Sequence, residues 1–136
     1  MRNTSIARHA VMALALGALA TGSASAVARE TGEAQLAKEL AGRVPGKPVD
    51  CLYMPSVTDS HVIDRTAIVY HSGSTIYVNR PRNGADSLRD DDVMVVKMNT
   101  SELCSIDTVT MHDRNGHFMT GIVFLGNFVP YTRRHG

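Results

Sequence analysis

Short runs of β-branched and other apolar residues, separated by turn residues, occupy most of the chain from residue 49 onward. Runs of this kind are typical of β-strands joined by tight turns. About five or six short strands predict a mainly β fold, namely a small antiparallel sheet or barrel with one N-terminal helix. We expect strands at residues 61–63, 67–70, 75–79, 93–98, 108–112 and 121–125.

Two segments carry information about turns and edges. Asn115-Gly116 is a strong signal for a two-residue hairpin loop, which would pair His117 with Arg114 and place His112 opposite Met119. Pro130 follows Phe128-Val129 and has no backbone N–H. We therefore expect this last run to lie at an edge or at the end of the sheet.

Residues 29–42 form the one convincing helical pattern. Leu36 and Leu40 recur at helical spacing, and Gly42 and Pro45 provide a stop. The apolar stripe is narrow, so both docking on the β-rich domain and a loose position ahead of it are compatible with the pattern. We interpret residues 27–48 as a helix with a Pro/Gly linker, and residues 49–136 as a single β-rich domain.

The first 26 residues have the pattern of a secretory signal peptide. Arg2 and Arg8 precede a short apolar stretch, and the small-residue triplet at 24–26 predicts cleavage between Ala26 and Val27. The apolar stretch is about half of the roughly 20 residues that a bilayer-spanning helix needs. We therefore expect an exported protein, periplasmic or secreted, with no membrane span in its mature form.

The charge balance excludes one class of partner. The chain has 14 basic and 13 acidic residues, and removal of the signal peptide takes away two arginines. Binding of nucleic acid requires a clustered basic face, which a nearly neutral chain does not indicate. We expect no nucleic-acid partner.

Cys51 and Cys104 are the only cysteines of the chain. An even number of cysteines in an exported chain favours a disulfide, here Cys51–Cys104. In the chain-entropy model, closing a loop of about fifty residues stabilises a fold by roughly 4 kcal/mol. Two unpaired buried thiols, and a thiol nucleophile with a histidine as its base, are the alternative interpretations.

Other polar clusters have ordinary explanations beside functional ones. Asp90-Asp91-Asp92 can bind Ca²⁺, but consecutive side chains of an extended chain point to opposite faces, which favours a solvated loop. His112 and His117 can share a metal only if the hairpin loop has four residues. We therefore predict no metal ligand, no cofactor and no cofactor-binding residue.

Aromatic side chains and catalytic motifs add little. Tyr70 and Tyr77 belong to the two arms of a predicted hairpin and should be neighbours, either in the core or on an aromatic recognition surface. The serine-hydrolase pattern GxSxG and glycine-rich phosphate loops are absent from the sequence. We predict no catalytic residue and a protein that is not an enzyme.

The segments VIDRTAIVYHSGSTIYVNRPRNG, SLRDDD, SELCSID and LGNFVPY follow one another between Cys51 and Tyr131. In this order and spacing they resemble a family of small exported proteobacterial proteins, domain-of-unknown-function family 6491. Members of that family often carry two further cysteines, one just before the position of Leu88 and one before the closing Leu-Gly. Both are missing here, and the resemblance thus implies that Cys51 is left to pair with Cys104. It implies no activity or substrate.

These observations favour a non-enzymatic exported module that binds a protein or surface component of the cell envelope, or has a structural role there. The alternative is a small periplasmic enzyme that pairs His61 or His71 with a carboxylate such as Asp64 or Asp107. A cleft with such a pair within hydrogen-bonding distance would favour the enzyme, and a flat apolar or tyrosine-rich patch would favour binding. The sequence specifies no oligomeric state.

Overall fold

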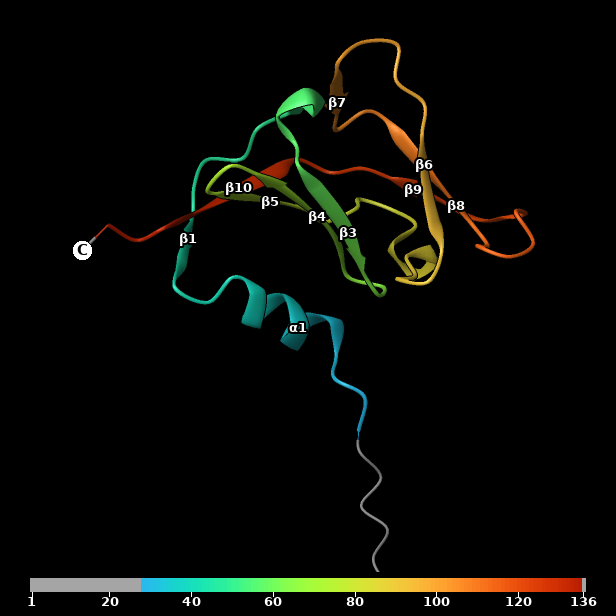
Figure 1. Ribbon diagram of the computed structural model, residues 1–136, viewed down its shortest axis with the longest axis horizontal. Helices are drawn as coiled ribbons and strands as arrows, with labels where there is room; N and C mark the ends of the chain where they lie inside the picture. Colours follow the sequence, from blue (N-terminus) through green and yellow to red (C-terminus); the bar gives the residue numbers. More distant parts are fainter. Residues whose placement is uncertain (1–27, 136) are drawn as a thin grey trace, which may run out of the picture.

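The computed structural model describes residues 28–135, so the predicted signal peptide and its Ala26–Val27 cleavage site lie outside the described residues. The described chain is mainly β, with one α-helix, two short 3-10 helices and ten strands in three antiparallel sheets (Figure 1). The elements are α1 (Gly32–Glu39), β1 (Arg43–Pro45), β2 (Cys51–Tyr53), η1 (Met54–Ser56), β3 (Asp59–Ile63), β4 (Ala67–Ser72), β5 (Thr75–Asn79), η2 (Ala85–Ser87), β6 (Val93–Val96), β7 (Glu102–Cys104), β8 (Thr108–His112), β9 (Met119–Phe124) and β10 (Phe128–Arg133).

The largest sheet has the strand order β1-β10-β5-β4-β3. Strands β3, β4 and β5 follow one another along the chain as two hairpins, with β3 at one edge of the sheet. In the β4–β5 hairpin Tyr70 lies directly opposite Tyr77, as expected. The expected mainly β, antiparallel fold is confirmed. The structure has more strands than expected because β1, β2 and β7 have only three residues each, too few to produce a recognisable alternation.

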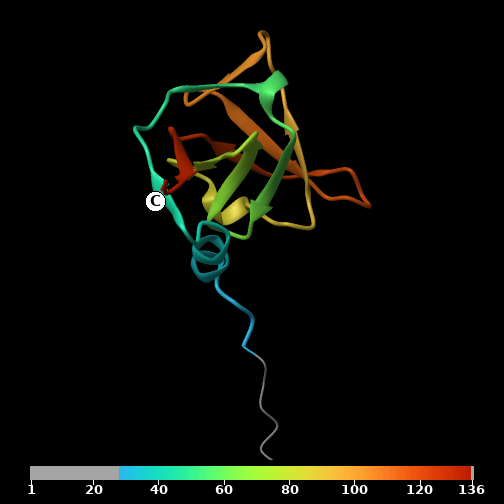
Figure 2. The same cartoon turned by 60° about the vertical axis from the view of Figure 1, so that its left-hand side comes forward.

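The second sheet has the order β6-β8-β9, and β2 pairs with β7 in a small ladder of its own. Alternation along β8 buries Val109 and Met111 and leaves Thr108, Thr110 and His112 on the other face. The half-exposed strand expected at residues 108–112 is therefore present. Figure 2 shows the strands curled around a common interior, with α1 outside them.

The five-stranded sheet has a hydrophobic cluster on each side. Ile68 and Tyr70 face the larger cluster, which also contains the inner residues of β8 and β9. Val69 and Ala67 face the smaller cluster, together with Leu36 of α1. The alternation of β4 thus separates the helix on one side from the three-stranded sheet on the other.

Helix α1 is docked on the β-rich domain, which decides between the two positions that the sequence left open. Thr31 caps its first turn by accepting a hydrogen bond from the backbone N–H of Ala34 at 3.2 Å. Leu36 is 2% exposed and inserts into the smaller cluster. Glu33 accepts two hydrogen bonds from Arg80, which lowers the pKa of its carboxyl.

The close approach of the helix depends on a glycine. A Cβ at Gly32 would overlap the hydroxyl of Thr66 and the backbone oxygen of Asp64, in the turn between β3 and β4. The helix is followed by β1, which pairs with β10 through Arg43 opposite Arg133. Residues 43–45 therefore belong to the sheet.

The prediction of a two-residue hairpin loop between β8 and β9 is wrong. The N–H of Asp113 bonds to the carbonyl of Phe118 at 2.9 Å, so residues 114–117 form a four-residue loop and His117 does not pair with Arg114. The side chain of Asp113 accepts from the N–H groups of Asn115 and Gly116, which stabilises the longer loop. His112 does lie opposite Met119, as expected.

The expectation that Pro130 marks an edge is also wrong, because β10 lies between β1 and β5. The carbonyl of Pro130 accepts a hydrogen bond from Gly46 at 2.7 Å, so its nitrogen faces the same side. At that point β1 has ended, and the partner is the connection at residues 46–48. The missing N–H of the proline therefore removes no bond of the β5–β10 ladder.

Candidate functional site

Cys51 and Cys104 form the predicted disulfide. They lie directly opposite each other in the β2–β7 ladder, with their Cα atoms 4.0 Å apart. Neither is a free thiol, so neither serves as a nucleophile in this state. Glu102 lies close enough to share a metal with these sulfurs, but a disulfide offers no thiolate ligand. A disulfide of this kind is typical of an oxidising compartment outside the cytoplasm.

The aspartates proposed as partners of the histidines have other contacts. Asp64 accepts a hydrogen bond from the backbone N–H of Asp90 at 2.7 Å. Asp107 accepts one from the N–H of Cys104, also at 2.7 Å, in the turn between β7 and β8. The structure therefore brings neither aspartate to His61 or His71.

Both histidines instead contact Glu39, the last residue of α1. The Nε2 atom of His61 lies 3.0 Å from Oε2 of Glu39, and the Nε2 atom of His71 lies 3.0 Å from Oε1. The two imidazole rings are 5.8 Å apart between centroids and inclined by 29°. All three side chains are partly buried. We call these three residues the His–Glu–His cluster.

The fold explains how the His–Glu–His cluster forms. His61 lies opposite Val69 in the β3–β4 ladder, and His71 is two residues further along β4, so both histidines share the face on which α1 packs. Leu36 fixes the helix on that face, and Glu39, three residues later, reaches the two rings. Glu39 was not among the predicted site residues, because the narrow apolar stripe of its helix does not specify where the helix docks.

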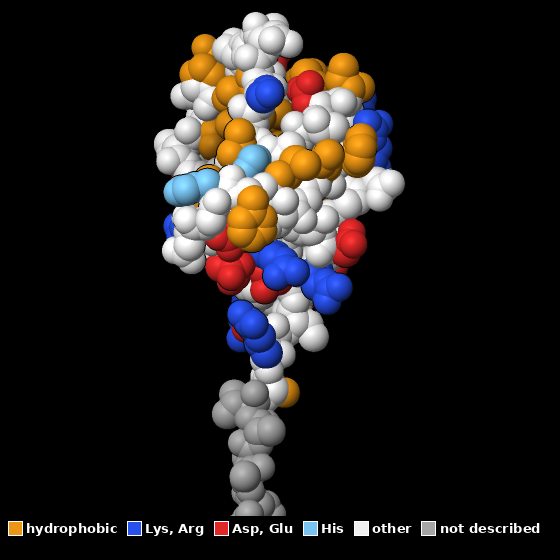
Figure 3. Space-filling view, turned by 90° about the vertical axis from the view of Figure 1, so that its right-hand side faces the viewer, with side chains coloured by type: hydrophobic (Ala, Val, Ile, Leu, Met, Phe, Trp, Pro, Cys, Tyr) orange, Lys and Arg blue, Asp and Glu red, His pale blue; other side chains and the backbone are white. Residues whose placement is uncertain are grey.

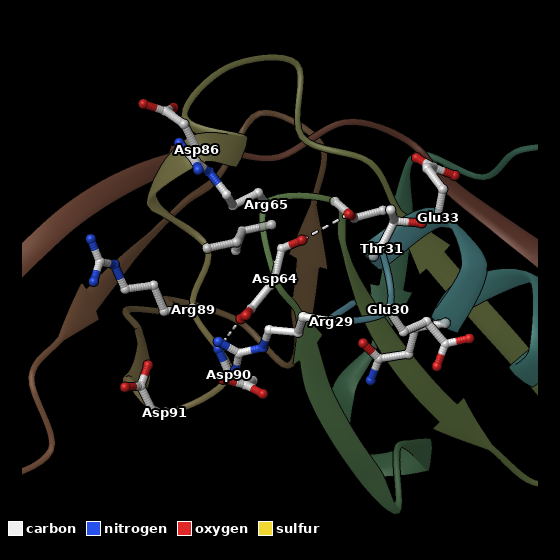
Figure 4. Close-up of a pocket in the computed structure, with 14 residues that line it drawn as sticks. Arg29, Glu30, Thr31, Glu33, Asp64, Arg65, Asp86, Arg89, Asp90 and Asp91 are labelled. Atoms are coloured by element: carbon white, nitrogen blue, oxygen red, sulfur yellow. Dashed lines mark hydrogen bonds between the residues drawn. The ribbon is translucent and has the colours of Figure 1, made fainter. Parts of the chain in front are cut away.

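A hollow lies between the start of α1, the β3–β4 turn and the loop that contains η2 (Figure 4). It is open to solvent, with a volume of about 870 Å³. Asp64 lies in its middle and is directed at the backbone of Asp90, as the figure shows. Charged residues of both signs line it, without a histidine or a cysteine: Arg29, Glu30, Glu33, Asp64, Arg65, Asp86, Arg89, Asp90 and Asp91.

The three consecutive aspartates do not converge. Asp92 is nearly buried and accepts a hydrogen bond from the hydroxyl of Thr120, whereas Asp90 and Asp91 are exposed in the loop before β6. Among the described residues, the groups with metal-binding geometry do not include them. The solvated-loop interpretation therefore fits Asp90 and Asp91, whereas Asp92 is turned inward.

The remaining histidines and tyrosines do not form a site either. His112 approaches the backbone oxygen of His117, at 3.4 Å, rather than its ring. Tyr70 is buried beside Phe128, while Tyr131 packs against the cluster under α1. The tyrosines therefore do not lie together on one recognition surface.

The outward face of the β6-β8-β9 sheet is rich in exposed apolar side chains. Residues directly opposite one another in its two ladders share that face, and they form three rows across the strands. We call this surface the outer face; it consists of Val93, Val95, Thr108, Thr110, His112, Met119, Ile122 and Phe124. Figure 3 views the side on which these strands lie and shows hydrophobic side chains spread across it.

The free face of an antiparallel sheet is ordinarily polar, but five of the eight outer-face residues are apolar. These apolar residues are 39–54% exposed, and Phe118 beside them at the hairpin tip is 62% exposed. The polar Thr108, Thr110 and His112 of β8 lie between the apolar side chains of β6 and those of β9. Exposed apolar side chains gathered on one face are typical of interaction sites.

Comparisons of the chain with protein-family models, with curated proteins and with solved structures find no match. Among the described residues, no helix has the length and apolar character needed to cross a membrane. The candidate sites are therefore judged on their own geometry.

Proposed function

We propose that this protein is a non-enzymatic, exported binding module of the cell envelope that binds another protein through the outer face. The observation that carries the proposal is the row Val95–Thr110–Ile122, flanked by rows that contain Val93 and Phe124, all on the exposed side of the sheet. Burial of such side chains stabilises association by about 25 cal/mol per Å² of apolar area, before the costs of binding.

The shape of the outer face favours a protein partner over a small molecule. Small ligands bind in concave pockets that cover most of their surface. The two described hollows lie beside α1 and at the edge of β3, and no outer-face residue lines either of them. The outer face of the sheet fits an extended apolar surface of comparable size, such as a sheet or helix of another protein.

The proposed location rests on two observations. Residues 1–26 have the pattern of a secretory signal peptide, and the described chain contains a disulfide. Both observations support a periplasmic or secreted location. The enzyme alternative named Asp64 and Asp107 as carboxylate partners for a histidine. Both aspartates are engaged elsewhere, and the two histidines contact Glu39 instead.

The experiment compares the variants Ile122→Glu and Ile106→Glu. Ile122 is at the centre of the outer face and 42% exposed, whereas Ile106 is in the turn after β7, outside the outer face, and 75% exposed. Both variants introduce the same charge at an exposed isoleucine. Protein exported with a photo-crosslinking residue at Thr110 should yield a specific crosslinked species, which Ile122→Glu abolishes and Ile106→Glu preserves.

Thermal melting of both variants checks that they are folded. Equal crosslinking by both variants would show that the partner does not bind through the outer face and would contradict the proposal. A crosslinked species with twice the mass of this chain would show that the outer face binds a second copy and not a different protein, which would also contradict the proposal.

A further inference from the structure

We propose that the His–Glu–His cluster is a binding site for a late first-row divalent transition metal, with Zn²⁺ as the ion it fits. This inference goes beyond the proposed protein-binding role and concerns a separate part of the surface, since none of the three residues belongs to the outer face. It begins from the convergence of three side chains from three different elements, α1, β3 and β4.

The spacing of the donor atoms suits a single ion. One oxygen of Glu39 and one nitrogen from each histidine all lie within 4.8 Å of one another. Ligands bound tetrahedrally at roughly 2.0–2.2 Å from Zn²⁺ lie roughly 3.3–3.5 Å apart. Side-chain rotations that move the donor atoms by about an ångström or less are therefore sufficient to bring all three donors onto one ion.

The chemistry of the donors selects the class of metal. Two imidazole nitrogens and one carboxylate oxygen suit Zn²⁺, Cu²⁺, Ni²⁺ or Co²⁺. Ca²⁺ and Mg²⁺ prefer a shell made of oxygen atoms, of which the cluster offers few. Three protein ligands leave a fourth position of a tetrahedral ion for water or for a group of another molecule.

The surroundings leave the cluster available to a cation. Glu39 is paired with no lysine or arginine among the described residues, so its charge is not neutralised by a permanent cation. The side chains of His61 and His71 are 38% and 32% exposed, which provides a route from solvent. His61 also borders a solvent-open hollow of about 480 Å³ whose wall includes Asp90 and Asp92.

A metal in this position would link α1 to the β3–β4 hairpin. A ligand that binds the folded chain and not the unfolded chain raises the free energy of unfolding. Binding of Zn²⁺ is therefore expected to raise the melting temperature of the protein, and removal of any one ligand should reduce that increase.

The test uses the exported, disulfide-bonded protein without an affinity tag, because a polyhistidine tag binds the same metals. Zn²⁺ affinity is measured by competition with a chromophoric chelator for the unmodified chain, Glu39→Gln, His71→Asn and His117→Asn. The last variant is the control, since His117 lies in the β8–β9 loop outside the cluster. Co²⁺ added in place of Zn²⁺ reports the coordination geometry by its visible absorption.

We expect one Zn²⁺ per chain, a tetrahedral Co²⁺ spectrum, and no displacement by Ca²⁺ or Mg²⁺. Loss of an outer-shell partner of a metal ligand already weakens binding by about 10–100-fold, so Glu39→Gln and His71→Asn, which remove ligands, should each weaken Zn²⁺ binding by at least that factor, while His117→Asn should not. The two ligand variants change different elements, so a folding defect in one leaves the other informative. Absence of Zn²⁺ binding by the unmodified chain, or equal affinity in all four proteins, would overturn the proposal and leave a hydrogen-bonded ion pair only.

Discussion

Tyr70 is the largest of the fully buried side chains, and its hydroxyl has no hydrogen-bond partner among the described residues. Its ring packs edge-on against Phe128, with centroids 5.7 Å apart. The apolar part of the side chain therefore stabilises the larger core, while the buried oxygen counteracts part of that gain.

Replacement of Tyr70 by phenylalanine is expected to raise the free energy of unfolding by about 1 kcal/mol, because it removes a polar group that is buried without a partner. Urea denaturation of the variant measures this change. Tyr53→Phe is the matched control, since Tyr53 is exposed and its loss of a hydroxyl should change the stability by less than about 0.5 kcal/mol. A destabilised Tyr70→Phe variant would show that the hydroxyl has a partner.

The same residue predicts a pH dependence. Burial raises the pKa of the Tyr70 hydroxyl above its ordinary value. Above about pH 10 the unfolded chain therefore loses this proton while the folded chain keeps it, so the free energy of unfolding falls as the pH rises. Between pH 9 and about pH 11, stability should decrease less in Tyr70→Phe than in the unmodified chain.

Individual residues also show where reasoning from the sequence succeeds and where it fails. The pairing of Cys51 with Cys104 followed from the count of cysteines and from the expected compartment. Glu39 was missed because its role depends on the docking of a helix, which no local pattern specifies. The signal that was present is the spacing of His61 and His71, which places both on one face of a predictable hairpin.

Among the elements, the hairpins with four or more residues per strand were predictable, since alternation and turn residues identify them. The strands β1, β2 and β7 were not, because three residues carry no periodicity and their pairing depends on distant partners. The loop between β8 and β9 shows a different limit. The strong local signal of Asn115-Gly116 does not decide the loop length, because the backbone N–H groups of these two residues donate hydrogen bonds to the carboxylate of Asp113.

The ladder of β2 and β7 is stabilised by the disulfide between Cys51 and Cys104. It has three residue pairs, one of which is the disulfide, and its other members include the buried Leu52 and Leu103. Two such short strands have few backbone hydrogen bonds with which to maintain their register. The disulfide joins residues that are 53 positions apart, so it restricts the unfolded chain considerably.

Removal of the disulfide in the double variant Cys51→Ala/Cys104→Ala is expected to lower the free energy of unfolding by about 4 kcal/mol. Urea denaturation under non-reducing conditions measures the difference. Adding a reductant should reduce the stability of the unmodified chain and leave that of the variant unchanged, which is the control. Two free thiols in denatured, unreduced protein would contradict the premise of this prediction.

The complete fold depends on residues 32–45, which lie in the segment predicted to be a helix and a linker. Helix α1 covers the smaller hydrophobic cluster, and β1 extends the five-stranded sheet beside β10. Residues 32–45 thus provide both a covering layer and an edge strand for the rest of the chain.

A chain that begins at residue 49 is therefore expected to be much less stable than one that begins at residue 28. Its smaller cluster, which includes Ile63 and Val78, would be exposed to solvent. Thermal melting and the binding of a hydrophobic dye to the two chains measure the difference. Equal melting temperatures would show that residues 49–136 form an independent domain.

The pairing of β1 with β10 has a consequence for how the chain acquires its structure. β1 lies near the start of the described chain and β10 at its end, and each residue of β1 pairs with one between Tyr131 and Arg133. Contacts between residues far apart in sequence form slowly, because a long loop must close before they can form. The β3–β4 and β4–β5 hairpins join neighbouring segments and can form early, whereas the five-stranded sheet is complete only when β10 pairs with both β5 and β1. Closing the sheet is therefore the slow, long-range step of folding, and a chain truncated before residue 131 leaves β1 without its partner.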